Sequence, residues 1–242
     1  MSTPVAIVLA AGEGRRMGGP KALLVVDGQP LVRAHAERLR ELGCRTIVVV
    51  RCAMLEDVRA LLGAASGVEL IASDTNSMAG SLVVGLRHAT PTVGSVIVVS
   101  TVDCLPVRHS TLSALLRSVR ANGVQVATPR YRGRGGHPVV ARESLLQPML
   151  RGYSGTLRDL IRGADAQRLR LDVDDSAVVG ELNTPADLAE ARPGLLPAFA
   201  RTGAGYCVSV SAASAAAQHV IAARSSPAPW LGALAATNPR PR

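Results

Sequence analysis

Continuous apolar runs recur along the chain and alternate with segments of helical spacing. The runs at residues 5–9, 47–50 and 96–99 contain only Val, Ile, Leu and Ala, which is typical of strands buried on both faces of a parallel sheet. Between them, segments such as residues 30–42 repeat apolar residues three or four positions apart, as on one face of a helix. This alternation predicts a doubly wound α/β domain with three layers, α/β/α, around a mostly parallel sheet.

The same pattern continues to about residue 192. Further strands are expected at residues 68–72, 124–128 and 168–173, and further helices at residues 54–62, 109–121 and 154–162, the last with Ser154 as its cap. Thr184 and Pro185 are the residue types of an N-cap and a first helical position, so they predict a closing helix. From residue 193 the chain is rich in Ala, Ser, Gly and Pro, with one Ala-rich helical pattern at 212–223. We therefore predict a domain over residues 1–192 and a low-complexity, flexible extension over residues 193–242.

A glycine-rich basic loop follows the first apolar run directly. Its glycines allow sharp turns that bring bare backbone N–H groups close to a ligand, and its cations supply the charge that phosphate oxygens require. The glycines are Gly12, Gly14, Gly18 and Gly19, and the cations are Arg15, Arg16 and Lys21. The loop is not a P-loop, because Pro20 precedes and Ala22 follows Lys21, and Met17 replaces the third glycine of a dinucleotide fingerprint. We expect it to hold a nucleoside triphosphate; the alternative is a basic turn that only connects a strand to a helix.

Polar residues follow later strands of the predicted sheet, where ligands of doubly wound sheets bind. Asp103 comes just after the run at residues 96–99 and is the expected ligand of Mg²⁺, which takes one or two carboxylates together with water and substrate phosphate. The loop at residues 73–81 follows another strand and is a second candidate for ligand contacts. The alternatives are structural, because Asp103 would also suit a turn or helix cap, and Asn, Ser and Gly before a helix are ordinary capping residues.

Composition narrows the class of ligand. The 242-residue chain has a formal net charge of +9, but its arginines are scattered along the sequence rather than gathered in one stripe. Aromatic residues make up only 2%, which leaves little surface for stacking the bases of single-stranded nucleic acid. The composition therefore favours a small anionic ligand and no nucleic-acid partner.

Cysteine usage and the N-terminus indicate a cytoplasmic protein. The four cysteines, Cys44, Cys52, Cys104 and Cys207, have no metal-ligand spacing and suit a reducing compartment. The first residues lack the charged start and apolar core of a signal peptide, and no apolar run approaches the ~20 residues of a membrane span. We expect no membrane association.

The glycine-rich loop matches a specific family pattern. Read as Leu9-Ala10-Ala11-Gly12-x-Gly14-x-Arg16-Met17-Gly18-x-x-Lys21, it resembles the signature of the MobA-like NTP transferases. Its opening, LAAG, resembles the molybdenum cofactor cytidylyltransferase branch of that family. The resemblance implies a Rossmann-like nucleotidyltransferase fold. It also implies that the nucleotide is bound by Leu9, Ala10, Ala11, Gly12, Gly14, Arg16 and Lys21, with Asn76, Gly80 and Ser81 from the loop at residues 73–81.

Two later segments extend the resemblance. Residues 131–140 resemble the GxxGHPv block that borders the acceptor phosphate in the family, which implies an acceptor site made of Arg132, Arg134, Gly136 and His137. For His137, a bond to the ligand and a role in fixing the Pro138 turn both remain open. Residues 181–188 resemble the family segment near the second metal position, with Asn183 where many members carry Asp, and an Asn oxygen can also ligate Mg²⁺. The chain departs from the family where it reads Asp103-x-x-Pro106 instead of Asp-x-Pro, which leaves the conformation of that loop open.

The resemblance implies transfer of a nucleoside monophosphate from an NTP to a phosphate-bearing acceptor, with release of pyrophosphate. Arg16, Lys21 and Asp103 are the implied catalytic residues, and Mg²⁺, on Asp103 and Asn183, is the implied cofactor. Ala11 favours CTP over GTP, and the GHP block favours molybdopterin as the acceptor. Two alternatives stay open: a sugar phosphate or other small phosphometabolite as acceptor, and a nucleotide-binding regulator without catalysis.

Overall fold

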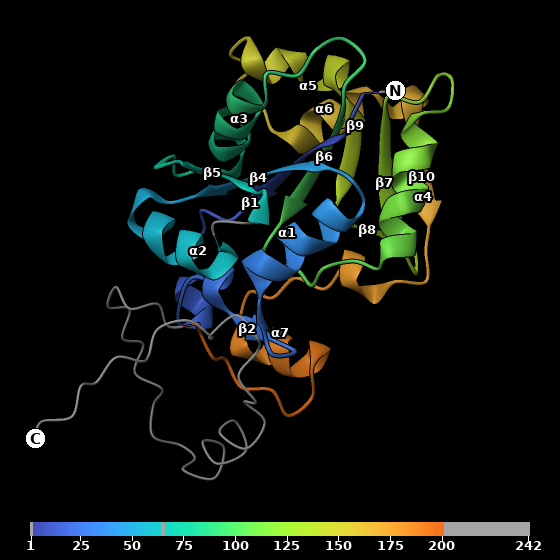
Figure 1. The fold of residues 1–242 in the computed structure, drawn as a ribbon. Coiled ribbons are helices and arrows are strands. Elements are labelled where there is room, and N and C mark those ends of the chain that lie inside the picture. The colour runs from blue at the N-terminus through green and yellow to red at the C-terminus, as the bar shows by residue number, and fades with distance from the viewer. Residues whose placement is uncertain (1, 64–65, 201–242) are drawn as a thin grey trace, which may run out of the picture. The chain divides into compact units, whose positions relative to one another are not determined.

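A mixed, mostly parallel sheet is the centre of the protein in the computed structural model, which describes residues 2–63 and 66–200 (Figure 1). Its strands are β1 (Val5–Leu9), β4 (Arg45–Val50), β5 (Glu69–Ala72), β6 (Val96–Thr101), β7 (Val126–Tyr131), β8 (Arg134–Gly135), β9 (Val139–Arg142) and β10 (Arg168–Asp172). Their order across the sheet is β10-β7-β9-β6-β1-β4-β5, and β8 pairs with β7. The pairs among β1, β4, β5 and β6 are parallel, whereas β9 runs antiparallel to both β6 and β7. The predicted fold class is confirmed.

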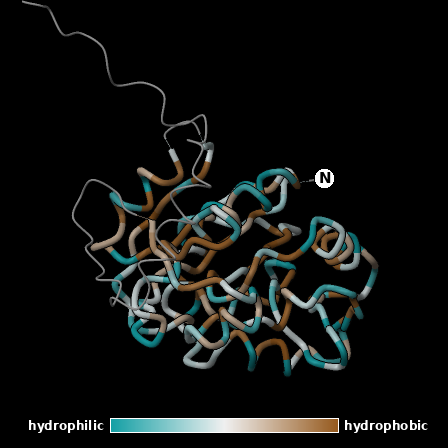
Figure 2. The backbone as a smooth tube through the Cα atoms, turned by 90° about the horizontal axis from the view of Figure 1, so that it is seen from below, coloured by the Kyte–Doolittle hydropathy of each residue, from teal (hydrophilic) through white to brown (hydrophobic). Residues whose placement is uncertain are grey.

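Helices cover both faces of this sheet. On one face lie α1 (Leu31–Glu41), α2 (Leu55–Leu62) and α4 (His109–Val119), and on the other lie α3 (Met78–Ala89), α5 (Glu143–Leu150) and α6 (Leu157–Gly163). Side chains of β1 alternate between two clusters: Ala6 and Val8 pack with the first set of helices, and Ile7 and Leu9 pack with the second. Figure 2 shows the consequence along the backbone, where the helices alternate between hydrophilic and hydrophobic positions around hydrophobic strands. Burial of each such large aliphatic side chain contributes about 1.5–3 kcal/mol.

A third, smaller hydrophobic cluster lies beneath the glycine-rich loop. The hairpin of β2 (Val25–Val26) and β3 (Gln29–Pro30) contributes Val26 to it, and the helix α7 (Pro185–Ala191) contributes Leu188. Leu24 just before β2, Leu182 just before α7, and Met17 of the loop are buried there too. Thr184 is the N-cap of α7 and Pro185 its first residue, as predicted.

The register of the parallel strands gathers several loops at one edge of the sheet. Leu9 at the end of β1 lies beside Val49 of β4 and beside Thr101 of β6, and Val50 lies beside Ala72 of β5. The segments that follow these strands, at residues 10–21, 51–54, 73–77 and 102–107, therefore begin at the same edge.

Three local predictions were wrong or incomplete. Thr156, not Ser154, caps α6, and it forms a reciprocal capping box with Asp159. The helix α5 was not predicted, and it carries Pro148 within its length. The acidic cluster of Asp172, Asp174 and Asp175 has the composition of a solvated turn, but Asp175 is only 3% exposed. Its carboxylate accepts hydrogen bonds from the Arg108 backbone N–H and the Thr111 hydroxyl at the start of α4.

The described chain continues beyond the predicted domain boundary at residue 192. Backbone hydrogen bonds join Ala198 and Ala200 to Val25 and Leu23, so this part of the predicted extension packs on the domain. The rest of that extension, including the helical pattern at 212–223, lies outside the described residues. Among the helices that are described, none has the length and apolar character needed to cross a membrane.

Candidate active site

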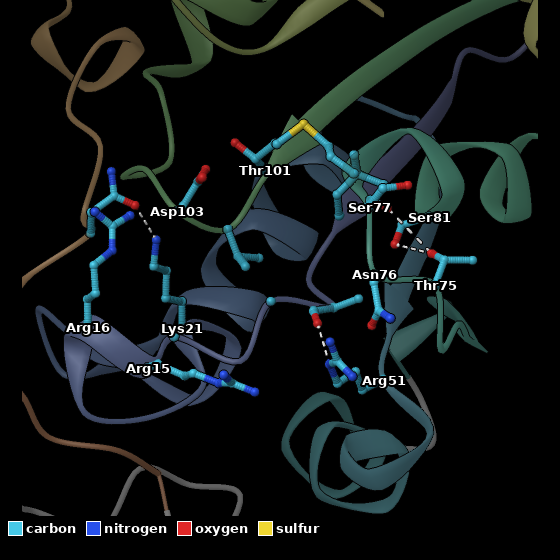
Figure 3. A pocket seen from close by; sticks show the side chains of 17 residues that line it. Arg15, Arg16, Lys21, Arg51, Thr75, Asn76, Ser77, Ser81, Thr101 and Asp103 are labelled. Carbon is cyan, nitrogen blue, oxygen red and sulfur yellow. Dashed lines mark hydrogen bonds between the residues drawn. The ribbon is translucent and has the colours of Figure 1, made fainter. Parts of the chain in front are cut away.

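A cavity of about 310 Å³ opens at the edge of the sheet where the loops gather (Figure 3). On one side, the figure shows the side chains of Arg16, Lys21 and Asp103 gathered together. On the other side lie Asn76, Ser77 and Ser81, with Arg51 below them. The lining residues are Leu9, Ala11, Gly12, Gly14, Arg15, Arg16, Lys21, Arg51, Thr75, Asn76, Ser77, Met78, Ser81, Thr101, Val102, Asp103 and Asn183.

The glycine-rich loop is a tight turn closed by its own backbone. The Gly14 carbonyl accepts hydrogen bonds from the N–H groups of Met17 (2.8 Å) and Gly18 (3.1 Å), and also from that of Gly19 (3.3 Å). Gly14 has φ +64°, and a Cβ there would lie 1.9 Å from the Gly19 carbonyl oxygen. Only glycine fits this position, so the motif glycine is required by the shape of the loop itself.

Lys21 joins the loop to a distant part of the chain. Its ammonium group donates a hydrogen bond of 2.7 Å to Asn183 Oδ1. Burial lowers the pKa of Lys21 below its ordinary value, and the neighbouring Asp103 carboxylate opposes that shift because it favours the charged form. Lys21 is also the only lysine in the sequence, where every other basic side chain apart from histidine is arginine.

Two hydrogen bonds hold the segment that carries Asp103. The Leu182 N–H donates to the Asp103 carbonyl (2.5 Å), and His35 Nε2 lies 2.8 Å from the Cys104 carbonyl oxygen. His35 is 4% exposed, and burial lowers its pKa, so the neutral ring donates to this carbonyl from Nε2 while Nδ1 accepts from the Ser100 hydroxyl at 3.2 Å. These contacts fix the backbone on both sides of the inserted residue in Asp103-x-x-Pro106.

The Cys104 thiol lies buried beside Asp103. Burial raises its pKa to about 12, and Asp103 adds to the shift. The thiolate is therefore disfavoured at neutral pH.

Hydroxyl groups form the opposite wall. Ser77 caps α3, because its side chain accepts a hydrogen bond of 3.0 Å from the Gly80 N–H. Thr75 Oγ1 lies 3.0 Å from the Ser73 hydroxyl and 3.1 Å from the Ser81 hydroxyl. The capping role that we held open for this loop thus belongs to Ser77, and Asn76 lines the cavity.

The sequence interpretation missed Arg51, which follows β4. Its Nε donates to the Ala11 carbonyl (3.0 Å), and its Nη2 lies 3.3 Å from Glu13 Oε1, so the side chain braces the first residues of the glycine-rich loop. Its position directly after an apolar run was the available signal, because the rule that singled out Asp103 applies equally to the end of β4.

Sequence and structure comparisons identify the family. The MobA-like NTP transferase domain matches residues 6–172, which is most of the chain and includes the loop, the wall and Asp103. The chain belongs to the MobA-like NTP transferase family. Membership supports nucleotidyltransferase activity.

One characterised protein and several solved structures are similar to this MobA-like transferase. Nicotine blue oxidoreductase of Paenarthrobacter nicotinovorans is 32% identical over 156 residues, covering 62% of this chain and 76% of the relative. Rv0371c of Mycobacterium tuberculosis H37Rv has a TM-score of 0.66 at 25% identity, covering 78% of this chain and 98% of its own. A nucleotidyl transferase of Methanothermobacter thermautotroptrophicus, Mth528, has a TM-score of 0.65 at 22% identity, covering 79% and 97% of the two chains.

Oxygen donors suitable for a hard divalent cation face the same MobA-like cavity. Asp103 offers a carboxylate and Asn183 an amide oxygen, and both residues line the cavity, but Asn183 Oδ1 accepts the hydrogen bond from Lys21 and would have to exchange it to ligate a cation. Within residues 2–63 and 66–200, no group of three or more His, Cys, Asp or Glu side chains could hold a metal ion. The Asp103 carboxylate alone fits an ion such as Mg²⁺, which is held by one or two protein oxygens and completed by water and phosphate.

Most of the predicted nucleotide-binding residues line the cavity of this MobA-like transferase. The exceptions are Ala10, which is fully buried, and Gly80, where a Cβ would lie 2.8 Å from the Thr75 Cβ. Gly80 therefore allows the first turn of α3 to approach the wall.

The four residues of the predicted acceptor site do not line this cavity. Arg132 lies over the Tyr131 ring, 5.1 Å from its centroid, and Arg134 is exposed on β8. A Cβ on Gly136 would lie 1.5 Å from the Val178 carbonyl oxygen, which accepts a 2.9 Å hydrogen bond from the His137 N–H. His137 Nδ1 is buried without a hydrogen-bond partner among the described residues. The acceptor assignment remains a proposal.

Proposed function

We propose that this protein transfers a nucleoside monophosphate, with CTP as the favoured donor, to a phosphate-bearing acceptor and releases pyrophosphate. The observation that carries the proposal is the 2.7 Å hydrogen bond between Lys21 and Asn183, 162 residues apart. This bond joins the end of the glycine-rich loop to the segment before α7, and both residues line the same cavity as Asp103. A glycine-rich loop, the Lys21 ammonium and the Asp103 carboxylate line one cavity, and nucleotidyl transfer uses groups of these kinds.

The proposed reaction needs no covalent intermediate with the protein. An acceptor phosphate oxygen attacks the α-phosphorus of the triphosphate and forms the new P–O bond. The bond from the α-phosphorus to the bridging oxygen breaks, and pyrophosphate leaves with that electron pair. Backbone N–H groups of the loop hold the β- and γ-phosphates, while Arg16 and Lys21 offset the negative charge that develops on the leaving group. Asp103 would hold a divalent cation, together with Asn183 once its oxygen exchanges the bond from Lys21, and such an ion would neutralise further charge on the phosphates.

Several comparisons and residues support the finer parts of the proposal. Rv0371c has been solved in complex with manganese, which supports a divalent cation. Mg²⁺ is the ion that we propose here. Ala11 in the LAAG sequence supports CTP over GTP, and the GHP block at residues 136–138 supports molybdopterin as acceptor. Arg132, Arg134, Gly136 and His137 are the residues proposed to contact that acceptor, with a sugar phosphate as the alternative.

Nucleotide-dependent thermal stabilisation tests the donor half of the proposal. A ligand that binds only the folded state raises the Tm by mass action. We expect CTP with Mg²⁺ to give the largest shift among CTP, GTP, ATP and UTP, and Asp103→Ala to reduce the part that depends on Mg²⁺. A larger shift with GTP would contradict the CTP assignment. No shift with any nucleotide at millimolar concentration would overturn the proposal.

Pyrophosphate release tests the acceptor half. With CTP and Mg²⁺ present, we expect release that depends on molybdopterin and is absent with a panel of sugar phosphates. Release with a sugar phosphate alone would reassign the acceptor within the same chemistry.

The relative named nicotine blue oxidoreductase favours a second candidate, a redox activity on a similar compound. The test is consumption of nicotine blue by the purified protein with a panel of electron donors and no NTP. Turnover under these conditions, without NTP-dependent pyrophosphate release, would favour the second candidate over the first.

A further inference from the structure

The segment at residues 195–200 pairs with the chain directly after Lys21. The Val25 N–H donates to the Ala198 carbonyl (2.7 Å), and the Ala200 N–H donates to the Leu23 carbonyl (2.8 Å). Leu24 and Phe199 form an antiparallel bridge between these bonds. The segment lies beyond residue 172, where the family match ends, and beyond the boundary that the sequence pattern predicted.

Phe199 reaches the glycine-rich loop itself. A Cβ built on Gly19 would lie 2.9 Å from both Cε1 and Cζ of the Phe199 ring, so the ring lies against the turn that precedes Pro20 and Lys21. The ring also packs against the cluster that contains Met17 and Leu24. Phe199 is the only phenylalanine in the sequence. The loop is thus held by the backbone hydrogen bonds to the Gly14 carbonyl and is contacted at Gly19 by an aromatic ring.

The same stretch of chain is attached to the loop region at further points. Asn183 accepts the hydrogen bond from Lys21 at one end of the stretch. Arg192 pairs with Asp27 in the β2–β3 hairpin at 2.9 Å, between Asn183 and the pairing at residues 198–200. Contacts on both sides of Lys21 therefore come from residues 183–200.

We propose that residues 195–200 are a positioning segment for the phosphate-binding loop and that Phe199 is its positioning residue. A glycine-rich loop has large conformational freedom, and ordering it only when a triphosphate binds would reduce affinity. Packing of Phe199 on Gly19 orders the loop in advance, which lowers the entropy lost on binding. The kinetic part of this inference rests on the proposed function, whereas the ordering of the loop does not.

Limited trypsin digestion of the full-length protein tests the ordering of the loop without any nucleotide. Arg15 and Arg16 lie within the loop, so cleavage after them, followed by mass spectrometry, reports its opening. We expect Phe199→Ala to speed this cleavage by about tenfold, because local opening controls proteolysis. Leu196→Ala, at a side chain that is 55% exposed in the same segment, is the matched control and should leave the rate unchanged. Equal cleavage rates in wild type and Phe199→Ala would overturn the proposal.

Kinetics and a second variant separate positioning from folding. We expect Phe199→Ala to raise the KM for the NTP by about tenfold, with a smaller effect on kcat. Phe199→Leu, which keeps a large apolar side chain, should have a KM close to that of the wild type. In Gly19→Ala the added methyl group would collide with the Phe199 ring. The resulting rise in the KM for the NTP should therefore be much smaller in the Phe199→Ala background than in the wild-type background. Additive effects of the two changes would contradict the contact as the cause. Faster loop cleavage in a protein that binds no nucleotide would support the positioning segment and count against the proposed function.

Discussion

Lys21 is placed where charge on a triphosphate would need an opposite charge. It is half-buried, it donates to Asn183, and it lies beside Asp103, whose carboxylate favours its protonated form. A buried ammonium interacts more strongly with a phosphate than an exposed one, because less water screens the interaction. The hydrogen bond to Asn183 also limits the positions that this flexible side chain adopts.

Lys21→Ala is expected to lower kcat by about two to three orders of magnitude, or roughly 3–4 kcal/mol of transition-state stabilisation. The reason is that the ammonium offsets charge that develops on the leaving group. The measurement is single-turnover pyrophosphate release at saturating NTP. Arg59→Ala, which removes an exposed cation paired with Glu56 on α2, is the control and should retain wild-type turnover. Wild-type turnover in Lys21→Ala would remove this residue from the mechanism.

At the scale of elements, the sequence pattern predicted what depends on local residue types. Apolar runs predicted β1, β4 and β6, because a strand buried on both faces requires consecutive apolar residues. The glycine spacing predicted the loop, because left-handed turns favour glycine. The roles of Asp175 and Phe199 depend on contacts with residues far away in the chain, at Arg108 and Gly19, and no local pattern encodes them. For Arg51, the end of the apolar run marked the position, but its contact with Glu13 could not be predicted locally. The helix α5 was missed because Pro148 interrupts an otherwise helical pattern.

The contact between residues 136–137 and the turn at Val178 is a junction between elements that the sequence reading treated as a ligand site. Gly136→Ala is expected to destabilise the protein by about 2 kcal/mol, because its Cβ would overlap the Val178 carbonyl and force the backbone apart. The measurement is the free energy of unfolding in urea. Gly163→Ala, at the end of α6 with open space around its Cβ position, is the matched control and should not destabilise. An unchanged free energy of unfolding in Gly136→Ala would contradict this prediction, because it would mean that the backbone at Val178 shifts to accept the methyl group without loss of stability.

At the scale of the whole molecule, global unfolding exposes buried histidines to protonation. Burial lowers the pKa of both His35 and His137 below that of an exposed histidine, with Asp103 partly opposing the shift in each case. Above the unfolded-state pKa of about 6.5, both rings are neutral in both states and the stability is fully present. As the pH falls below that value, the unfolded chain binds protons that the folded chain does not, so the free energy of unfolding decreases. The slope reaches at most about 1.4 kcal/mol per pH unit for each such histidine.

His35→Gln should therefore weaken the dependence of stability on pH between about pH 6.5 and 5. Glutamine keeps a hydrogen-bonding side chain near the Cys104 carbonyl and the Ser100 hydroxyl but takes up no proton in this range. Carboxylates with lowered pKa values, such as Glu69 at about 2, lose their contribution mainly below about pH 5, so they affect only the lower end of this window. We expect the variant to be less stable than wild type at pH 7.5 and to lose less stability on acidification, measured by urea unfolding at half-unit steps. Parallel curves for the two proteins would show that His35 does not link protonation to unfolding, and the remaining slope would then fall to His137, which His137→Gln tests in the same way.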